Sequence, residues 1–124
     1  MREIEASQIT SAVKQLFIKA SYHLPEDVKN ALLKAIQNET TNAAKQVLEI
    51  LLENAQIAAQ NDFPLCQDTG IAFVFVELGQ DVHICGGLLE DAVNAGVEQA
   101  YDEGFLRKSV VEDPLRRKNT GNNL

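Results

Sequence analysis

The residues Phe63-Pro64-Leu65-Cys66-Gln67-Asp68-Thr69-Gly70 separate a long helix-forming run from a run of β-branched and aromatic residues. Within this segment, here called the motif loop (residues 63–70), a thiol, an amide, a carboxylate and a hydroxyl follow one another. Loops between rigid elements often carry the reactive side chains of a protein. We therefore predict that the motif loop is part of an active site and that the rest of the chain supports it.

Three helices are predicted before the motif loop. Apolar residues recur at spacings of three and four over residues 5–21, and again over residues 28–36. Pro25 separates these two helices, because the residue before a proline is disfavoured in helical geometry. Residues 42–60 form a third helix whose apolar stripe is wide, which indicates burial on more than one side and a central position.

A β-hairpin and a fourth helix are predicted after the motif loop. Residues 71–78 are almost entirely apolar and rich in strand formers, which favours a strand buried on both faces. Residues 79–81 form a turn, and residues 82–85 return as its antiparallel partner. Residues 88–101 read as a helix in which Gly96 indicates close packing, and Gly104 ends it.

The remaining residues 105–124 have weaker patterning, with a short extended piece at 106–111, a turn at Asp113-Pro114 and loop residues from Asn119 onward. The predicted fold is therefore α+β: N-terminal helices packed on a small antiparallel hairpin sheet, then a further helix. We expect a single domain over 1–124, with a helical part (1–60), the loop, hairpin and helix (61–104) and a basic, substrate-side segment (105–124). No regular element follows residue 104, so we expect a fragment of a larger domain.

Composition narrows the classes of partner. The 124 residues carry a formal net charge of −7, which argues against nucleic acid. No apolar run is long enough for a membrane span, and the first residues lack a signal peptide, so a cytoplasmic location is expected. Five of the eleven basic residues lie in one twelve-residue window and are here called the basic cluster: Arg107, Lys108, Arg116, Arg117 and Lys118. These residues suit an anionic ligand or an acidic partner, or they form a solvated tail.

The chemistry of single residues leaves alternatives open. Cys66 and Cys85 are the only cysteines, and each is a buried thiol, a reactive thiol or a ligand. Cys85, between apolar neighbours, is interpreted as a packing residue. Asp68 is either a catalytic or substrate-binding carboxylate or a turn residue. Arg107 either binds a carboxylate in bidentate fashion or lies on the surface. Three further polar residues are interpreted as structural or solvated: His23, Glu77 and His83.

Four segments in order carry a resemblance to a known family. They are Pro64 to Gly70, Gly86-Gly87 opening a helix, Leu106-Arg107, and Asn119-Thr120-Gly121-Asn122-Asn123. Together they resemble the N-terminal part of class I fumarate hydratases, the iron–sulfur hydro-lyases related to the alpha subunit of tartrate dehydratase. The resemblance runs from the third predicted helix to the last residue.

This resemblance implies roles for four residues. Cys66 matches one of three cysteines that hold a [4Fe–4S] cluster, Gln67 and Asp68 match groups that contact the dicarboxylate, and Arg107 matches an arginine that grips a substrate carboxylate. The loop from Asn119 lies near that site in the family. No residue here matches the general base, so the catalytic residue stays unknown.

The implied activity is that of a carbon–oxygen lyase: reversible hydration of fumarate to malate in the tricarboxylic acid cycle, with the cluster's thiolate-free iron as Lewis acid. Cys85 matches neither of the two other cluster cysteines, and Asn122 stands where many relatives have an acidic residue. We therefore expect the chain alone to be inactive and to need a beta subunit or C-terminal domain, in an oligomer. Two alternatives are a tartrate dehydratase alpha-subunit fragment and a non-catalytic assembly domain that retains the motif.

Overall fold

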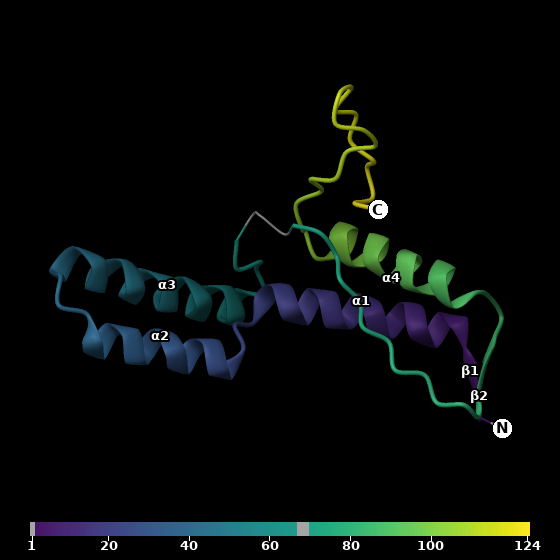
Figure 1. The fold of residues 1–124 in the computed structure, drawn as a ribbon, viewed down its shortest axis with the longest axis horizontal. Coiled ribbons are helices and arrows are strands. Elements are labelled where there is room, and N and C mark those ends of the chain that lie inside the picture. The colour runs from purple at the N-terminus through teal and green to yellow at the C-terminus, as the bar shows by residue number, and fades with distance from the viewer. Residues whose placement is uncertain (1, 67–69) are drawn as a thin grey trace. The chain divides into compact units, whose positions relative to one another are not determined.

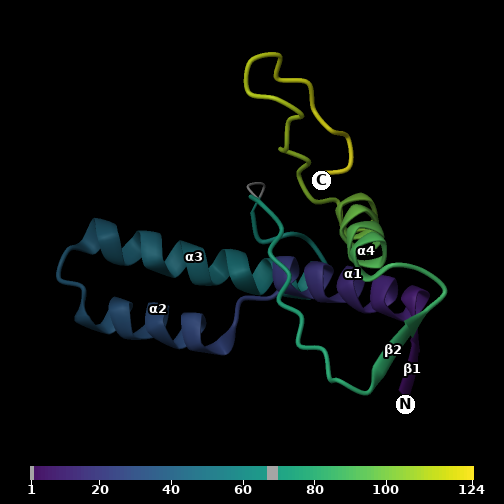
Figure 2. The same cartoon turned by 45° about the vertical axis from the view of Figure 1, so that its right-hand side comes forward.

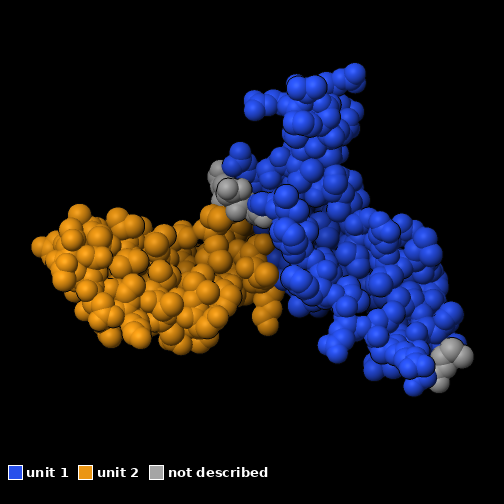
Figure 3. All heavy atoms as spheres, in the orientation of Figure 1, with its two compact units in different colours: residues 1–18, 67–124 blue, residues 19–66 orange. Residues whose placement is uncertain are grey.

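The computed structural model describes residues 2–66 and 70–124. In chain order the elements are β1 (Arg2–Glu5), α1 (Ala6–Tyr22), α2 (Glu26–Asn38), α3 (Asn42–Asn61), β2 (Val82–Cys85) and α4 (Leu89–Glu103) (Figure 1). The chain divides into two compact units, unit 1 with residues 1–18 and 67–124 and unit 2 with residues 19–66 (Figure 3). The mixture of helices with a small sheet confirms the predicted α+β class.

The four predicted helices are confirmed close to their expected bounds, because each has a local start or stop signal. Pro25 precedes α2, and acidic Glu26 and Asp27 occupy its first turn, where they face the positive end of the helix dipole. The left-handed Asp62 (φ 52°) ends α3, and its amide donates to the carbonyl of Ala58. Gly104 follows α4 as its C-cap, as predicted.

The predicted antiparallel hairpin is wrong. Residues 71–79 contain no strand, and β2 pairs instead with the N-terminal β1 in parallel, with Arg2 opposite Val82 and Glu5 opposite Cys85 (Figure 2). The turn before β2 does form, since the amide of Val82 donates to the carbonyl of Gly79 at 3.1 Å. The sheet partner lies 80 residues away in the chain, since Arg2 is opposite Val82, and parallel pairing leaves no turn signal in the local sequence.

Residues 71–78 also differ from the prediction in their burial. Phe73 is 75% exposed and Phe75 is 95% exposed, whereas a strand buried on both faces was expected. Strand-forming residue types alone do not make a strand, because its backbone groups need a neighbouring edge to pair with. Within the described residues, the edge of β2 is taken by β1.

The core of unit 1 lies where α4 packs against the first part of α1. The buried side chains are mostly small or aromatic, and the rings of Phe17 and Tyr101 lie 6.5 Å apart between centroids. A Cβ added at Gly96 would lie 2.7 Å from the carbonyl oxygen of Thr10 and 2.7 Å from the Cβ of Val13. Gly96 therefore permits the close approach that the sequence predicted there.

Unit 2 is a helical hairpin of α2 and α3, which run side by side in opposite directions (Figures 1 and 2). The prediction that α3 is a central helix is wrong for the part of the chain described: Ala58 is its only buried residue there. Several apolar side chains of α3 face solvent instead, namely Val47, Ile50, Leu51 and Ile57. One face of α3 packs against α2, and its second apolar stripe is uncovered.

Candidate functional site

The entry to the motif loop is held by backbone hydrogen bonds within unit 2. The amide of Phe63 donates to the carbonyl of Ala58 at 3.1 Å, and the amide of Leu65 donates to the carbonyl of Ser21 at 2.8 Å. The carbonyl of Leu65 accepts a third hydrogen bond, at 2.8 Å, from the side-chain amide of Asn54 on α3. The chain is therefore fixed up to the residue before Cys66.

Cys66 is the last residue of unit 2, and its side chain is exposed. The alternative of a buried packing thiol is thereby removed. Gln67 and Asp68, which the resemblance implies as substrate-binding groups, lie outside the described residues. Their predicted roles stay predictions.

Cys85 differs from Cys66 in its surroundings. It lies half-buried on β2, opposite Glu5 of β1. Burial, followed by the nearby carboxylates of Glu3 and Glu5, raises the pKa of the Cys85 thiol above its ordinary value. Because a metal ligand must be a thiolate, this environment makes Cys85 a poor ligand and fits its predicted packing role.

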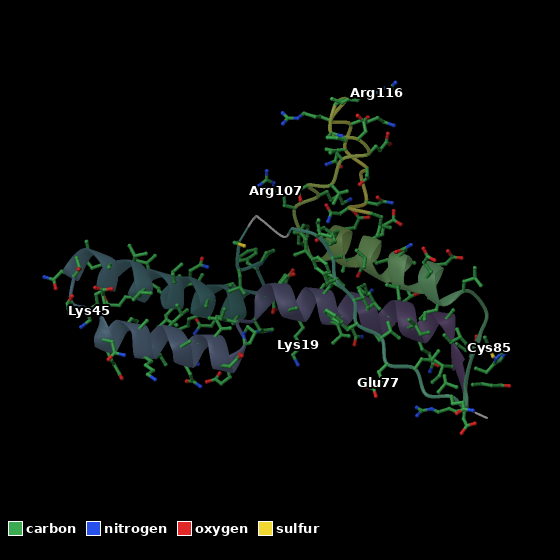
Figure 4. All side chains as sticks on the ribbon, in the orientation of Figure 1. Lys19, Lys45, Glu77, Cys85, Arg107 and Arg116 are labelled. Atoms are coloured by element: carbon green, nitrogen blue, oxygen red, sulfur yellow. The ribbon has the colours of Figure 1, made fainter. Side chains whose placement is uncertain are left out.

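Arg107 lies in unit 1, in the irregular segment after α4 (Figure 4). The preceding Leu106 is 5% exposed, and its amide donates to the carbonyl of Tyr101 at 3.1 Å. The buried leucine anchors the backbone, and the next side chain, that of Arg107, is exposed. An exposed guanidinium next to a fixed backbone suits the binding of a carboxylate.

Residues 108–124 fold back on themselves, so that two of the segments carrying the resemblance become neighbours. The side-chain amide of Asn119 donates to the carbonyl of Lys108 at 2.9 Å, and the amide of Thr120 donates to the carbonyl of Val110 at 3.1 Å. The segment from Asn119 therefore lies against the residues that directly follow Arg107. The sequence placed these two segments in order, and the fold places the second against the residues that follow the first.

The turn between them was predicted correctly at Asp113-Pro114. The carboxylate of Asp113 accepts hydrogen bonds from the amides of Leu115 and Arg116, both at 2.9 Å. This is the local side-chain-to-backbone bonding that makes aspartate common in turns. The turn is what returns the chain toward residues 108–111.

Part of the basic cluster is neutralised within unit 1. Lys108 pairs with Asp102, and Lys118 pairs with Glu112 at 2.9 Å. Arg116 and Arg117 lie on the turn itself, and both are exposed. The two lysines of the basic cluster therefore serve contacts within unit 1, and Arg116 and Arg117 are exposed on the turn.

A groove of about 610 Å³ lies in unit 1 between the exit of the motif loop, α4 and the C-terminal residues. Its walls are mostly apolar, with Asn94, Ser109 and Asn123 as polar exceptions. No Lys or Arg side chain is among the described residues that line it. A dicarboxylate needs cationic partners, so this groove does not suit one.

Two asparagines in these contacts were not singled out from the sequence. Asn54 reads as an ordinary helix residue, and Asn123 as a loop residue. Asn123 is nevertheless 3% exposed, and its side-chain oxygen accepts hydrogen bonds from the amides of Ser109 and Val110. The one available signal for Asn54 was an asparagine inside a helix, where this residue type is disfavoured.

An iron–sulfur cluster requires several side-chain donors that lie close together. Among the described residues no three His, Cys, Asp or Glu side chains come together as a metal site. Cys66 alone has the exposed thiol that a cluster ligand requires. Among the described residues, the donor set for a cluster is therefore this single exposed thiol.

The family model described as fumarate hydratase (Fumerase) matches residues 10–124. A protein of Methanocaldococcus jannaschii, named as an L(+)-tartrate dehydratase alpha subunit, is 38% identical over 118 residues, covering 94% of this chain and 41% of the relative. The anaerobic class I fumarate hydratase of Escherichia coli is 34% identical over 125 residues, covering 98% of this chain and 23% of the relative.

These matches indicate the class of enzyme. The relatives are named as enzymes that add or remove water, which are the hydro-lyases among the carbon–oxygen lyases. With most of its length matched, the chain belongs to the fumarate hydratase (Fumerase) family. It spans about two fifths of the tartrate dehydratase alpha subunits and less than a quarter of the fumarate hydratases that it matches. No described helix has the length and apolar character to cross a membrane.

Proposed function

We propose that this chain is the N-terminal part of an iron–sulfur hydro-lyase that reversibly hydrates fumarate to malate. The observation that carries the proposal is the family match over residues 10–124, which includes the Cys66-Gln67-Asp68-Thr69-Gly70 string and Arg107. The exposed thiol of Cys66 and the exposed guanidinium of Arg107 support it. Both side chains are accessible to groups that the described residues do not include.

The proposed role of Cys66 is to supply one thiolate of a [4Fe–4S] cluster. When bound, such a cluster supplies an iron without a thiolate ligand, which acts as a Lewis acid toward the hydroxyl and carboxylate of the substrate. Arg107 binds a substrate carboxylate through two N–H groups, and Gln67 and Asp68 contact the same dianion. These residues bind and orient the substrate, and the general base lies outside this set.

The remaining ligands and much of the pocket come from a further part of the polypeptide or from a beta subunit. The relatives of Methanocaldococcus jannaschii and Escherichia coli named as alpha subunits support a divided enzyme of this kind. The domain proposed for residues 1–124 is then one portion of a larger assembly, and its activity depends on that assembly.

Tartrate dehydration is the second candidate, favoured by one observation. The relative at 38% identity is named for tartrate, whereas the class I fumarate hydratases of Geobacillus stearothermophilus and Escherichia coli are 33% and 34% identical. The two reactions remove or add water at the same kind of carbon, next to a carboxylate. Assaying both fumarate and L(+)-tartrate with one preparation separates them.

The test uses the chain joined to the rest of its alpha-type polypeptide and co-expressed anaerobically with a beta-type partner. Cys66→Ser is expected to abolish hydration and to lower bound iron, whereas Cys85→Ser, the matched control, keeps both. Hydration of fumarate and of L(+)-tartrate is measured beside iron content per chain. Unchanged activity in Cys66→Ser would refute the proposed enzyme function and favour a non-catalytic assembly domain.

A further inference from the structure

We infer that Asn54 is a positioning residue for Cys66, an inference that depends on the proposed role of Cys66 as a cluster ligand. Asn54 lies on α3, eleven residues before the carbonyl that it binds. Its side-chain nitrogen is 2.8 Å from the carbonyl oxygen of Leu65, the residue directly before Cys66.

The peptide bond between Leu65 and Cys66 transmits this contact. The six atoms from the Cα of Leu65 to the Cα of Cys66 lie in one plane, because the C–N bond has partial double-bond character. A hydrogen bond that holds the carbonyl oxygen of Leu65 therefore also restricts the Cα of Cys66. Only the rotations about the N–Cα and Cα–Cβ bonds of Cys66 then separate this fixed plane from the sulfur.

Leu65 is held on its other side as well. Its amide donates to the carbonyl of Ser21 at 2.8 Å, near the end of α1. Both backbone groups of Leu65 are thus bound, one by the backbone of α1 and the other by a side chain of α3. The backbone contact cannot be removed by substitution of a side chain, but the contact of Asn54 can.

A fixed approach matters most for a metal ligand. Groups that orient a ligand without touching the metal commonly change metal affinity about 10–100-fold when they are removed. The thiol of Cys66 is exposed, so the backbone that carries it contributes to where the sulfur lies. Because Asn54 holds the backbone directly before Cys66, it restricts the positions that the thiol can occupy.

Asn61 provides a matched control on the same helix. Its side-chain nitrogen donates to the carbonyl of Ile57 at 2.9 Å, and this contact is also exposed. The bond closes within the last turn of α3 and does not reach the motif loop. Asn61→Ala therefore removes a side-chain-to-carbonyl bond of the same chemistry from the same helix.

The experiment compares Asn54→Ala and Asn54→Asp with Asn61→Ala. Aspartate has nearly the shape of asparagine, but its carboxylate cannot donate a hydrogen bond. In the 124-residue chain the amide of Leu65 keeps its bond to the carbonyl of Ser21, so its hydrogen exchange measures how often the entry to the motif loop opens. This exchange is expected to accelerate about 5–10-fold in both Asn54 variants, because one hydrogen bond that holds the same residue is lost. In the anaerobically assembled enzyme, release of iron to a chelator is expected to accelerate about tenfold, while the melting temperature is unchanged. Asn61→Ala changes neither rate.

Iron release at the wild-type rate in both Asn54 variants would overturn the inference, as would equal acceleration in Asn61→Ala. Cys66→Ser is measured in parallel to separate the two claims. Loss of iron in Cys66→Ser with no effect in the Asn54 variants refutes the positioning role alone. Full retention of iron in Cys66→Ser refutes the proposed function, and the positioning role with it.

Discussion

The side-chain oxygen of Asn123 lies 2.7 Å from the amide nitrogen of Ser109. The same oxygen accepts a second hydrogen bond from the amide of Val110 at 2.9 Å, and the side-chain nitrogen reaches the carbonyl of Gly70 at 3.5 Å. Asn123 has a left-handed backbone (φ 64°), a conformation that asparagine adopts more readily than most residues. One buried side chain therefore joins the C-terminal residues, the segment after Arg107 and the exit of the motif loop.

Asn123→Ala is expected to destabilise unit 1 by roughly 1–3 kcal/mol, because two part-buried hydrogen bonds lose their acceptor. Asn122→Ala is the control, since its side-chain oxygen accepts a local hydrogen bond, from the amide of Leu124 two residues on, at 3.2 Å. The measurement is the free energy of unfolding in urea. Equal losses in the two variants would contradict the assignment of Asn123 as the internal connection.

Arg107→Ala is expected to raise the Michaelis constant of the assembled enzyme about 10–100-fold, which corresponds to the loss of a charged, bidentate hydrogen bond. Arg116→Ala serves as the control, because Arg116 belongs to the same basic cluster but lies on the turn beyond Asp113. Steady-state kinetics with fumarate and with L(+)-tartrate measures both. An unaltered constant in Arg107→Ala would remove Arg107 from the substrate site.

Gly96→Ala is expected to cost about 1–3 kcal/mol of stability, because a methyl group would overlap α1. The added Cβ would come 2.7 Å from the carbonyl oxygen of Thr10, a backbone atom that cannot turn away. The better helix propensity of alanine offsets at most about 1 kcal/mol of this. Gln99→Ala, at an exposed position of the same helix, should stay within about 0.5 kcal/mol of the parent. Urea unfolding followed by circular dichroism measures both, and a more stable Gly96→Ala would refute the close approach of α4 to α1.

The carboxylate of Glu39 should titrate below its ordinary value. Its oxygen accepts hydrogen bonds from the amides of Thr41 at 2.8 Å and Thr40 at 2.9 Å, and these bonds lower the pKa of Glu39. A carboxyl whose folded pKa is lowered stabilises the fold above its unfolded pKa, and this contribution is lost as pH falls through the folded pKa. The stability difference between the parent and Glu39→Gln should therefore vanish in acid. An NMR titration of the side-chain carbon checks the midpoint, and a value at or above 4.5 would contradict the contact.

The helices were predictable because their signals are local. The spacing of apolar residues, the proline at 25 and the glycine at 104 each act on neighbouring residues, and the structure places α1 to α4 accordingly. The turn at Asp113 follows the same logic, since an aspartate side chain bonds the amides that follow it. Hydrophobic pattern alone failed at residues 71–78, where strand-forming residues are present but no strand is formed.

The candidate site residues stay predictions, and the contacts that hold the backbone beside them were not foreseen. Cys66 and Arg107 were proposed from the ordered segments that resemble a family, and both side chains are exposed. Asn54 and Asn123 were missed, because each acts on a backbone carbonyl or amide distant in the chain. Nothing in the residues adjacent to either asparagine indicates such a partner.

The motif loop illustrates what the sequence predicts and what depends on the tertiary structure. By itself the sequence determined the four helices and the family, because these depend on residue identity, short-range spacing and order along the chain. The chemical roles assigned to Cys66 and Arg107 stay predictions. Only the tertiary structure decided that β1 pairs with β2, that residues 119–123 close on residues 108–110, and that Asn54 holds the carbonyl before Cys66. Each of those contacts has a backbone group of a residue distant in sequence as at least one partner, and backbone groups are the same in every residue type apart from proline.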